Sequence, residues 1–216
     1  MRFHNRTHAG QLLAQRLSSW ANQPDVLVLA LPRGGVPVAF QVALALHAPL
    51  DVWVVRKLGA PEQPELAMGA IAPGGIQILD SRLVAELGIP AEEIDRIVAR
   101  ERVELDRRLA AYRGNRPPID PHAKTVLVVD DGLATGASMR AAVASLRPLA
   151  PARIVVAVPV ADSRISSRLA QDADEVVCFY TPPHLDAVGQ WYEDFSQTTD
   201  DEVRLILAQA QRTTDH

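Results

Sequence analysis

The chain has 216 residues and a formal charge of -4 at neutral pH, because 26 acidic residues outweigh 22 basic ones. At roughly 150 residues per domain, this length predicts one domain with additions rather than two. An acidic chain with scattered arginines lacks the concentrated basic face that releases counterions from a polyanion, so neither nucleic acid nor an anionic membrane is an expected partner.

The N-terminal ten residues contain no apolar segment of the kind found in a secretory leader, and no run of about 18 apolar residues occurs in the sequence. We therefore expect a soluble, cytoplasmic protein. The first predicted element is an amphipathic helix, which places Ala9, Leu13, Leu17 and Trp20 on one face and ends before Pro24.

Short β-rich runs alternate with helical patterns through the middle of the chain. The predicted strands are apolar at odd and even positions alike, as is typical of strands covered on both faces. They lie at residues 26–31, 50–55, 124–130, 153–160 and 175–179, with helices at 36–47, 138–146 and 163–170. This alternation predicts an α/β fold with a doubly wound, mainly parallel sheet and helices on both faces. Ligands of such sheets bind at the carboxyl ends of the strands.

A long helix predicted at residues 90–112 interrupts this alternation. Opposite charges stand four residues apart in it, as Glu92 with Arg96 and Glu104 with Arg108, which predicts a solvated charged face. Its apolar stripe is predicted to pack on the core, and a second copy of the chain is the other interpretation. The stripe consists of Ile94, Val98, Leu105, Leu109 and Tyr112.

Two features are predicted near the C-terminus. The single cysteine, Cys178, lies in the last predicted strand, where we expect it to be buried. A final helix is expected to begin at Thr199, where Glu202 completes a capping box.

The most informative segment is a predicted strand that ends in two carboxylates, Asp130 and Asp131, before a loop of small residues and a helix. Backbone amides of such a loop converge on a phosphate, and the helix N-terminus adds partial positive charge. Adjacent carboxylates repel a phosphate, so they suit the hydroxyls of an attached ribose or positive charge that develops on its ring. The predicted phosphate loop consists of Ala134, Thr135, Gly136, Ala137 and Ser138.

This segment resembles the fingerprint of the type I phosphoribosyltransferase family, in which four apolar and two acidic residues precede a short loop with Thr-Gly. Two other interpretations are a βα turn that contains Thr-Gly by chance and a receiver domain of a signalling protein. A receiver domain carries its acidic pair near the N-terminus and has no Thr-Gly phosphate loop. The resemblance covers about residues 26–179 and a C-terminal portion.

The resemblance implies a donor substrate, phosphoribosyl pyrophosphate, and a magnesium ion, Mg2+. The 5'-phosphate would lie on the phosphate loop and the ribose hydroxyls on Asp130 and Asp131. Arg33, Gly34 and Gly35 would bind the magnesium-bridged pyrophosphate, since the corresponding loop of the family does so through backbone amides, often with a cis peptide. Glycines permit such close approach.

The resemblance also gives roles to Arg56 and Lys57, which end the second predicted strand and would contact the departing pyrophosphate. An exposed surface lysine is the alternative interpretation of Lys57. Residues 58–69, with glycines at both ends, are interpreted as a mobile lid, and residues 75–79 would complete its hairpin.

By the same resemblance, a small hood from residues 1–20 and 180–195 would recognise an accepting base. Trp191, Tyr192 and Phe195 are candidates for stacking on that base, with packing inside the hood as the alternative. Asp194 is a candidate metal contact because an Asp-aromatic pair follows Val-Gly in the 6-oxopurine enzymes, with one residue less between them. A solvated or capping acid is the alternative for Asp194.

Two departures limit the identification of the base. Ala134 stands where the 6-oxopurine enzymes carry an acid, and Pro159 and Val160 stand where they carry a base-reading lysine. We therefore predict one phosphoribosyltransferase-like domain over residues 1–216, with a core at about 24–180 and a hood at about 1–22 and 180–216. Because relatives often dimerise, a homodimer is among the expected partners.

The predicted function is transfer of a 5-phosphoribosyl group from phosphoribosyl pyrophosphate to a small nitrogenous base in nucleotide metabolism, with release of pyrophosphate. The alternative is a non-catalytic sensor of phosphoribosyl pyrophosphate or a nucleotide on the same fold. A third interpretation is a hydrolase or phosphatase that acts on the donor. The sequence does not identify the accepting base.

Overall fold

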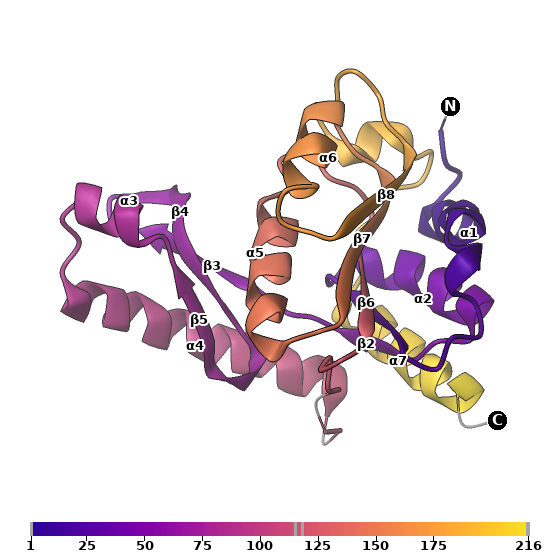
Figure 1. Ribbon diagram of the computed structural model, residues 1–216, viewed down its shortest axis with the longest axis horizontal. Coiled ribbons are helices and arrows are strands. Elements are labelled where there is room, and N and C mark those ends of the chain that lie inside the picture. Colours follow the sequence, from indigo (N-terminus) through magenta and orange to yellow (C-terminus); the bar gives the residue numbers. More distant parts are fainter. Residues whose placement is uncertain (1, 115, 118, 215–216) are drawn as a thin grey trace.

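The computed structural model describes residues 2–114, 116–117 and 119–214, and its centre is a five-stranded parallel sheet flanked by helices (Figure 1). The strand order is β2-β1-β6-β7-β8, so β6 lies in the middle. The predicted α/β fold with a parallel sheet is therefore confirmed. The strands are β1 (Val26–Ala30), β2 (Leu50–Val52), β6 (Thr125–Val129), β7 (Arg153–Val160) and β8 (Glu175–Tyr180).

Alternate side chains of the strands enter two apolar layers, one on each face of the sheet. Val26, Val28 and Ala30 of β1 belong to the layer under α1, α2 and α7, whereas Leu27 and Leu29 belong to the layer under α5 and α6. All five side chains are buried, as predicted from the apolar residues at both odd and even positions of the strand. The helices are α1 (Arg6–Arg16), α2 (Gly35–Leu46), α5 (Ala137–Leu146), α6 (Ser163–Leu169) and α7 (Asp200–Thr214).

One predicted strand is wrong in its extent: the run at 50–55 leaves the parallel sheet after Val52. The next residue, Trp53, is buried, and its indole Nε1 donates a hydrogen bond to Ser145 Oγ of α5 at 2.9 Å. The chain then enters a second, antiparallel sheet at Arg56. Arg56 and Lys57 consequently begin a hairpin instead of ending a core strand.

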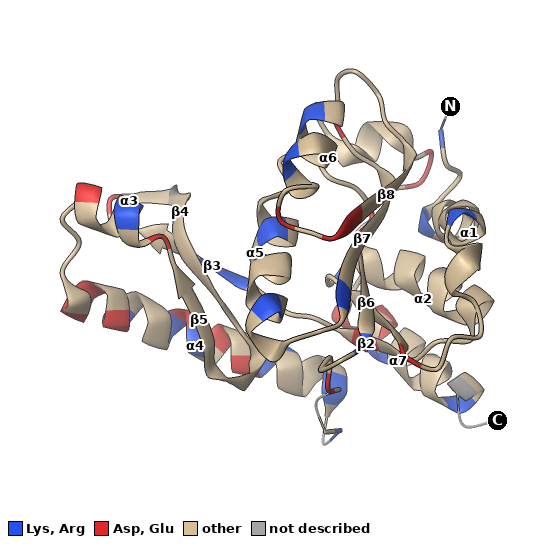
Figure 2. Ribbon diagram, viewed as in Figure 1, with Lys and Arg blue, Asp and Glu red and all other residues tan. Residues whose placement is uncertain are grey.

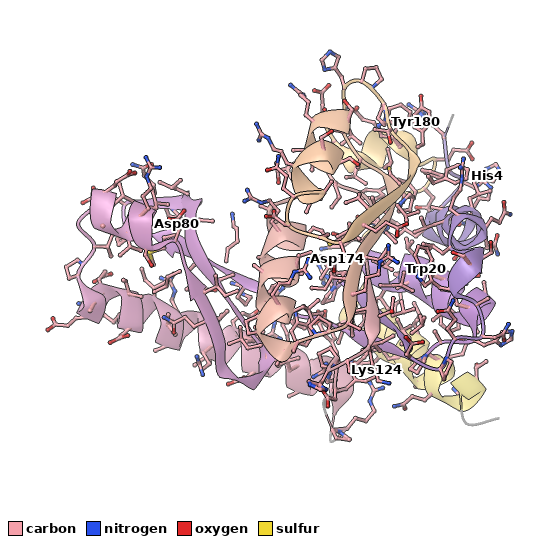
Figure 3. The ribbon with its side chains drawn as sticks, in the orientation of Figure 1. His4, Trp20, Asp80, Lys124, Asp174 and Tyr180 are labelled. Atoms are coloured by element: carbon pink, nitrogen blue, oxygen red, sulfur yellow. The ribbon has the colours of Figure 1, made fainter. Side chains whose placement is uncertain are left out.

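Together with α3 and α4, this second sheet forms an arm, residues 56–113, that projects from the core (Figure 1). Figure 3 shows Asp80 out on the arm, well separated from Lys124 and Asp174 of the core. Residues 58–69 lie mainly in two paired strands of the arm, and their action as a lid stays a prediction. The elements are β3 (Arg56–Ala60), β4 (Gln63–Ala72), β5 (Ile76–Leu79), α3 (Ser81–Glu86) and α4 (Ala91–Arg113).

The long helix α4 connects the arm to the core. Its apolar stripe is covered by the chain itself, because Ile94, Val98, Leu105 and Tyr112 belong to the main apolar cluster. Acidic and basic residues alternate along its length (Figure 2).

The charged pairs of α4 follow the sequence prediction in part. Glu104 accepts from Arg108 at 2.7 Å as predicted, but Arg96 pairs with Glu93 at 2.6 Å rather than with Glu92. A spacing of three residues brings side chains together on a helix as well as a spacing of four, so sequence alone does not choose between two adjacent glutamates.

The remaining predictions concern the ends of the chain. Cys178 lies in β8 but is only half-buried, because β8 is an edge strand. The capping box is confirmed: Thr199 N donates to Glu202 Oε2 at 2.6 Å, and Glu202 N donates to Thr199 Oγ1 at 3.2 Å. Met1 and residues 215–216 of the predicted hood lie outside the described residues. Among the helices in the described ranges, none is long and apolar enough to cross a membrane.

Candidate active site

Asp130 and Asp131 follow the central strand β6 directly, so they lie at the carboxyl edge of the sheet. One oxygen of each carboxyl group is already hydrogen-bonded. Asp130 Oδ1 accepts from the amide of Asp131 at 2.9 Å, and Asp131 Oδ2 accepts from Arg6 Nε at 2.8 Å. Among the described residues, no side chain donates a hydrogen bond to the other two oxygens, Asp130 Oδ2 and Asp131 Oδ1. Each carboxyl group therefore keeps one oxygen that no side chain in the described ranges occupies.

The two carboxyl groups influence each other's ionisation. Burial, and then the neighbouring Asp131 carboxylate, raise the pKa of Asp130 well above the usual value for an aspartate. Burial also raises the pKa of Asp131, and the ion pair with Arg6 opposes this rise. Arg6 therefore favours the charged form of Asp131 in a place where burial disfavours it.

The predicted phosphate loop follows the acid pair, Asp130 and Asp131, and ends in the first turn of α5. Leu133 N donates to Val160 O at 2.9 Å, and Leu133 O accepts from Asp162 N at 3.4 Å, so the loop is joined to the end of β7. Gly136, the residue before α5, has a φ of 70°, which glycine adopts without a steric penalty. Within the described ranges, the amides of residues 134–136 have no hydrogen-bond acceptor. A loop with unpaired amides at a helix N-terminus can bind a phosphate.

The predicted pyrophosphate segment lies against the acid pair. The peptide bond between Pro32 and Arg33 is cis, the feature that the resemblance implied. A Cβ atom on Gly34 would lie 2.7 Å from Asp131 Cγ, and one on Gly35 would lie 2.7 Å from Val129 O. These two glycines therefore permit the loop to approach the end of β6, and a side chain at either position would collide with it.

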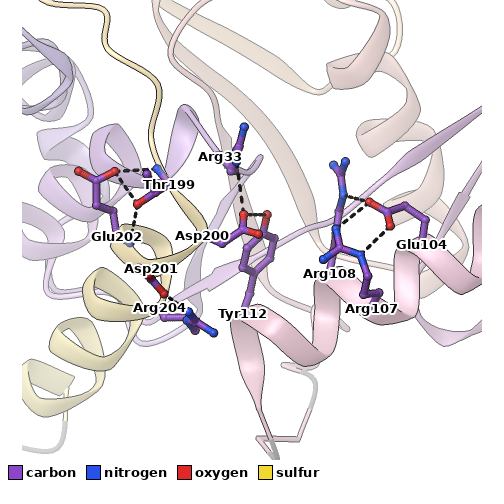
Figure 4. A network of polar contacts seen from close by, with 10 residues as sticks. All are labelled: Arg33, Glu104, Arg107, Arg108, Tyr112, Thr199, Asp200, Asp201, Glu202 and Arg204. Carbon is purple, nitrogen blue, oxygen red and sulfur yellow. Dashed lines mark hydrogen bonds and ion pairs between the residues drawn. The ribbon is translucent and has the colours of Figure 1, made fainter.

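The guanidinium of Arg33 is held at the N-terminus of α7. Arg33 Nη1 lies 3.6 Å from Asp200 Oδ1, and the same oxygen accepts from the Tyr112 hydroxyl of α4 at 2.9 Å (Figure 4). Burial, followed by this hydrogen bond, raises the pKa of Tyr112 to about 12. Three segments that are distant in the sequence thus meet at one carboxylate beside the predicted pyrophosphate loop.

A cavity of about 450 Å³ lies between the arm and the carboxyl edge of the sheet. It brings together Arg56 and Lys57 of β3, Pro32 of the predicted pyrophosphate loop, and Ser138 of the predicted phosphate loop. Glu101 of α4 also lines the cavity and accepts from Arg56 Nε at 3.0 Å and from Arg56 Nη2 at 2.5 Å. Arg56 is therefore oriented by α4, a contact that the local sequence does not indicate.

The two segments of the predicted hood contact each other through backbone hydrogen bonds. Phe3 N donates to Trp191 O at 2.8 Å, and Phe3 O accepts from Glu193 N at 2.8 Å. Tyr192 is buried, and its hydroxyl donates to the main-chain oxygen of Asp131 at 2.6 Å.

The candidate stacking residues differ in how they pack. The ring of Tyr192 packs against Phe3 and Phe195, whereas Trp191 packs against Tyr180. Tyr192 therefore serves the packing of the hood onto the acid pair. Stacking of Trp191 and Phe195 on a base stays a prediction.

Asp194, the candidate metal contact, is exposed. Its Oδ1 accepts from Ser196 N at 2.9 Å, and this hydrogen bond lowers the pKa of Asp194. In the part of the chain that the structure describes, no three His, Cys, Asp or Glu side chains are grouped so that they could hold a metal ion. The contact between Asp194 and a metal stays a prediction.

Three residues of this region have no signal in the sequence: Arg6, Glu101 and Asp200. Each is an ordinary charged residue of a helix or of its first turn, and each contacts a predicted site residue that is far away in the sequence. No local pattern could have selected them, because contacts between distant segments leave no fixed spacing.

Comparison with known proteins gives consistent matches. The family model described as a phosphoribosyl transferase domain matches residues 4–195. "Putative phosphoribosyl transferase Rv0571c" of Mycobacterium tuberculosis strain H37Rv is 47% identical over 210 residues, which are 97% of this chain and 47% of that protein. The counterpart in strain CDC 1551, "Putative phosphoribosyl transferase MT0597", has the same identity and coverage. The chain thus spans about half the length of these relatives.

A solved structure supports the whole fold. The crystal structure of TT1426 from Thermus thermophilus is 44% identical in sequence and has a TM-score of 0.88. The match covers 97% of this chain and 99% of that one, so it includes the arm and the hood as well as the sheet.

Proposed function

Since the chain belongs to the phosphoribosyl transferase domain family, we propose that it transfers the 5-phosphoribosyl group of phosphoribosyl pyrophosphate to a small nitrogenous base and releases pyrophosphate. The main support is the acid pair, Asp130 and Asp131, which directly precedes the loop whose amides at residues 134–136 have no acceptor in the described ranges, and which keeps Asp130 Oδ2 and Asp131 Oδ1 without a side-chain partner there. Two neighbouring carboxyl oxygens suit the two neighbouring hydroxyls of a ribose, and the amides suit its 5'-phosphate.

The pyrophosphate of the donor would extend from the ribose toward the cavity that Arg56 and Lys57 line. Arg33 would have to exchange Asp200 for pyrophosphate, and the long and partly exposed ion pair between them makes this exchange easy. Cations in this position accept the charge that accumulates on the leaving group.

Magnesium is treated in this proposal as part of the substrate. The absence of a group of three potential ligands among the described residues does not fit a metal site built by the protein alone. Magnesium commonly keeps several waters and binds substrate phosphates with few protein ligands. Such an ion would arrive bound to the pyrophosphate and would neutralise part of its charge.

In the proposed reaction, a nitrogen of the base attacks C1 of the ribose while the bond from C1 to the pyrophosphate oxygen breaks. The transition state carries positive charge on the ribose ring, and the carboxylates of the acid pair stabilise that charge. The bonding electrons leave with the pyrophosphate. The arm would act as the lid that keeps water from C1.

Calorimetric titration with phosphoribosyl pyrophosphate and magnesium tests this placement. We expect the double variant Asp130→Asn with Asp131→Asn to lose binding by at least about 100-fold, as expected when two charge-assisted hydrogen bonds are weakened. Asp172→Asn, an exposed carboxylate paired with Arg140, is the matched control and should bind like the unmodified protein. Equal binding by the double variant would exclude this role of the acid pair.

A donor sensor without turnover is the second candidate function, and it is favoured by Ala134, which supplies no acid or base next to the predicted reacting atoms. Pyrophosphate release over a panel of purine and pyrimidine bases separates the candidates. Release with one base supports the transferase, and tight donor binding without release supports the sensor. Release without any base indicates a hydrolase.

A further inference from the structure

Arg6, the first residue of α1, reaches from an outer helix to the acid pair at the centre of the sheet edge. Its Nε donates to Asp131 Oδ2 at 2.8 Å, and its Nη1 donates to Ser196 O at 2.6 Å. Its guanidinium also lies over the ring of Phe195, 4.0 Å from the ring centre. The Arg6 and Asp131 side chains are only 12% and 14% exposed. An ion pair this well buried is far less screened by water than one on the surface.

Asp131 is also held by a second residue of the hood, Tyr192. The Tyr192 hydroxyl donates to the main-chain oxygen of Asp131 at 2.6 Å, and Tyr192 pairs with Phe3 in a short parallel bridge. Arg6 and Phe3 come from the beginning of the chain, whereas Tyr192 and Ser196 come from near its end. Asp131 is therefore the residue on which both segments of the hood converge.

The neighbours of Asp131 explain why its carboxylate needs a partner of opposite charge. The charged groups around its carboxylate are the Asp130 carboxyl, with which it has a mutual repulsion, and Arg6, which attracts it, while the uncharged hydroxyl of Tyr192 contacts its backbone. Asp194 and Glu202 lie within electrostatic reach of Arg6 and complete the set of titrating groups around this pair. Without Arg6, the Asp131 carboxylate would face only a like charge in a buried place, which favours its protonation or rotation away from Asp130.

We infer that Arg6 is a positioning residue for Asp131: it occupies one carboxylate oxygen and directs the other oxygen toward the site where the proposed function places the donor ribose. The same guanidinium joins this carboxylate to Ser196 and Phe195 of the hood. A change in the position of the hood is thereby transmitted to the residue that would contact the ribose, 125 positions away in the chain from Arg6.

The test uses Arg6→Gln, which removes the charge, and Arg6→Lys, which keeps it without the planar donor fork. Arg16→Gln, on the same helix and also beside an aromatic ring, is the control, because Arg16 is exposed and lies over the ring of Phe179, whereas Arg6 is paired with Asp131. Binding of phosphoribosyl pyrophosphate with magnesium is measured by calorimetry from pH 6 to pH 9.

For Arg6→Gln we expect at least about tenfold weaker binding at neutral pH, with partial recovery toward pH 9 as Asp131 ionises. Arg6→Lys should recover most of the affinity and a pH profile close to that of the unmodified protein. If Arg6→Gln binds with unchanged affinity and an unchanged pH profile, the inference is wrong.

A second readout needs no ligand and separates this inference from the proposed function. The midpoint of thermal unfolding is measured against pH for Arg6→Gln, Asp131→Asn and the double variant. We expect a loss for Arg6→Gln that is largest at high pH and shrinks as Asp131 becomes protonated. In the Asp131→Asn background the loss should be smaller and independent of pH, because only the contacts of Arg6 with Ser196 and Phe195 remain to be lost. A loss that is independent of pH and additive with Asp131→Asn overturns the inference. If the unmodified protein does not bind the donor, the proposed function fails, and this cycle still decides the role of Arg6.

Discussion

Charged side chains are largely shielded from water at the acid pair, whereas those along the arm are mostly exposed. At the end of β6, two carboxyl groups are packed against a half-buried arginine, a buried tyrosine and two glycines at which a side chain would collide with the end of the strand. Along α4, acidic and basic side chains pair with each other at the surface, as Glu104 does with Arg107 and Arg108. Ion pairs of the second kind contribute little to stability, whereas charges of the first kind change stability, ionisation and binding together.

The arm is joined to the parallel sheet at a buried ion pair. Arg113, the last residue of α4, lies 2.8 Å from Asp51 of β2, and both side chains are less than a tenth exposed. Arg113 Nη2 also donates to Val52 O at 3.0 Å. The arm is thus fastened to the edge of the parallel sheet by a charged group that is as well buried as the groups of the candidate active site.

The largest effect is expected from breaking this junction. Arg113→Met leaves the Asp51 carboxylate buried without its partner and should lower the free energy of unfolding by about 3–5 kcal/mol. Urea denaturation measures the change. Arg82→Met, which removes an exposed ion pair of the arm, is the control and should change stability by no more than about 0.5 kcal/mol. Similar losses in the two variants would contradict the distinction between the regions.

A smaller loss is expected from filling the space between the predicted pyrophosphate loop and the acid pair. Gly34→Ala places a methyl group 2.7 Å from Asp131 Cγ, which should cost about 1–3 kcal/mol of stability and also weaken donor binding. Denaturation and calorimetry on the same preparation check both parts. A fully stable variant with unchanged donor affinity would show that the loop moves away freely.

On the arm, substitution should affect binding more than stability. Arg56→Met should weaken binding of the donor about tenfold, because a charge-assisted contact with pyrophosphate is lost. It should lower stability by less than Arg113→Met does, because Glu101 keeps its ion pair with Arg100. Arg96→Met, at an exposed position of α4, should leave both unchanged. A loss of stability without a loss of affinity would assign Arg56 a structural role with Glu101.

The smallest expected effect is a gain in folding stability. Because the pKa of Asp130 is raised in the folded state, the unfolded chain releases this proton first, and stability falls as pH rises from about 4 toward the raised pKa. Asp130→Asn removes the penalty and should raise stability at neutral pH, a gain that disappears near pH 4. Thermal unfolding against pH measures it.

Asp174→Asn is the control, because the pKa of Asp174 is shifted in the opposite direction to that of Asp130. Its ion pair with Arg147 lowers the pKa of Asp174, so its contribution to stability is present at neutral pH and is lost in acid. A pH-independent effect at both positions would contradict the assigned shifts.

Much of the core could be predicted from sequence, because a strand that is buried on both faces has a continuous run of apolar residues. The apolar runs of β1 and β7 identified both strands, and the two carboxylates with their small-residue loop identified the sheet edge where they lie. Residues 50–55 were apolar by the same criterion, yet only the first three join the sheet. Trp53 is apolar because it packs under α5, and the pattern does not distinguish the two reasons for burial.

The supporting residues of the candidate site could not be predicted for a different reason. Arg6 and Glu101 act through contacts across more than forty positions, and their neighbours in sequence are those of ordinary surface helices. The aromatic residues of the hood were recognised as a group, but only the structure separates Tyr192, which is buried against the acid pair, from Phe195, which is partly exposed.

The hydrogen bonds that join Leu133 to Val160 and Asp162 have a thermodynamic consequence. A loop that must become ordered around its ligand loses about 1–2 kcal/mol of backbone entropy per residue at room temperature. At Leu133, the residue before the predicted phosphate loop, that loss has already occurred during folding, because Leu133 extends the pairing of β7. A phosphate that binds to the loop would therefore order a segment that is already fixed at its first end, and less would be subtracted from its affinity for ordering.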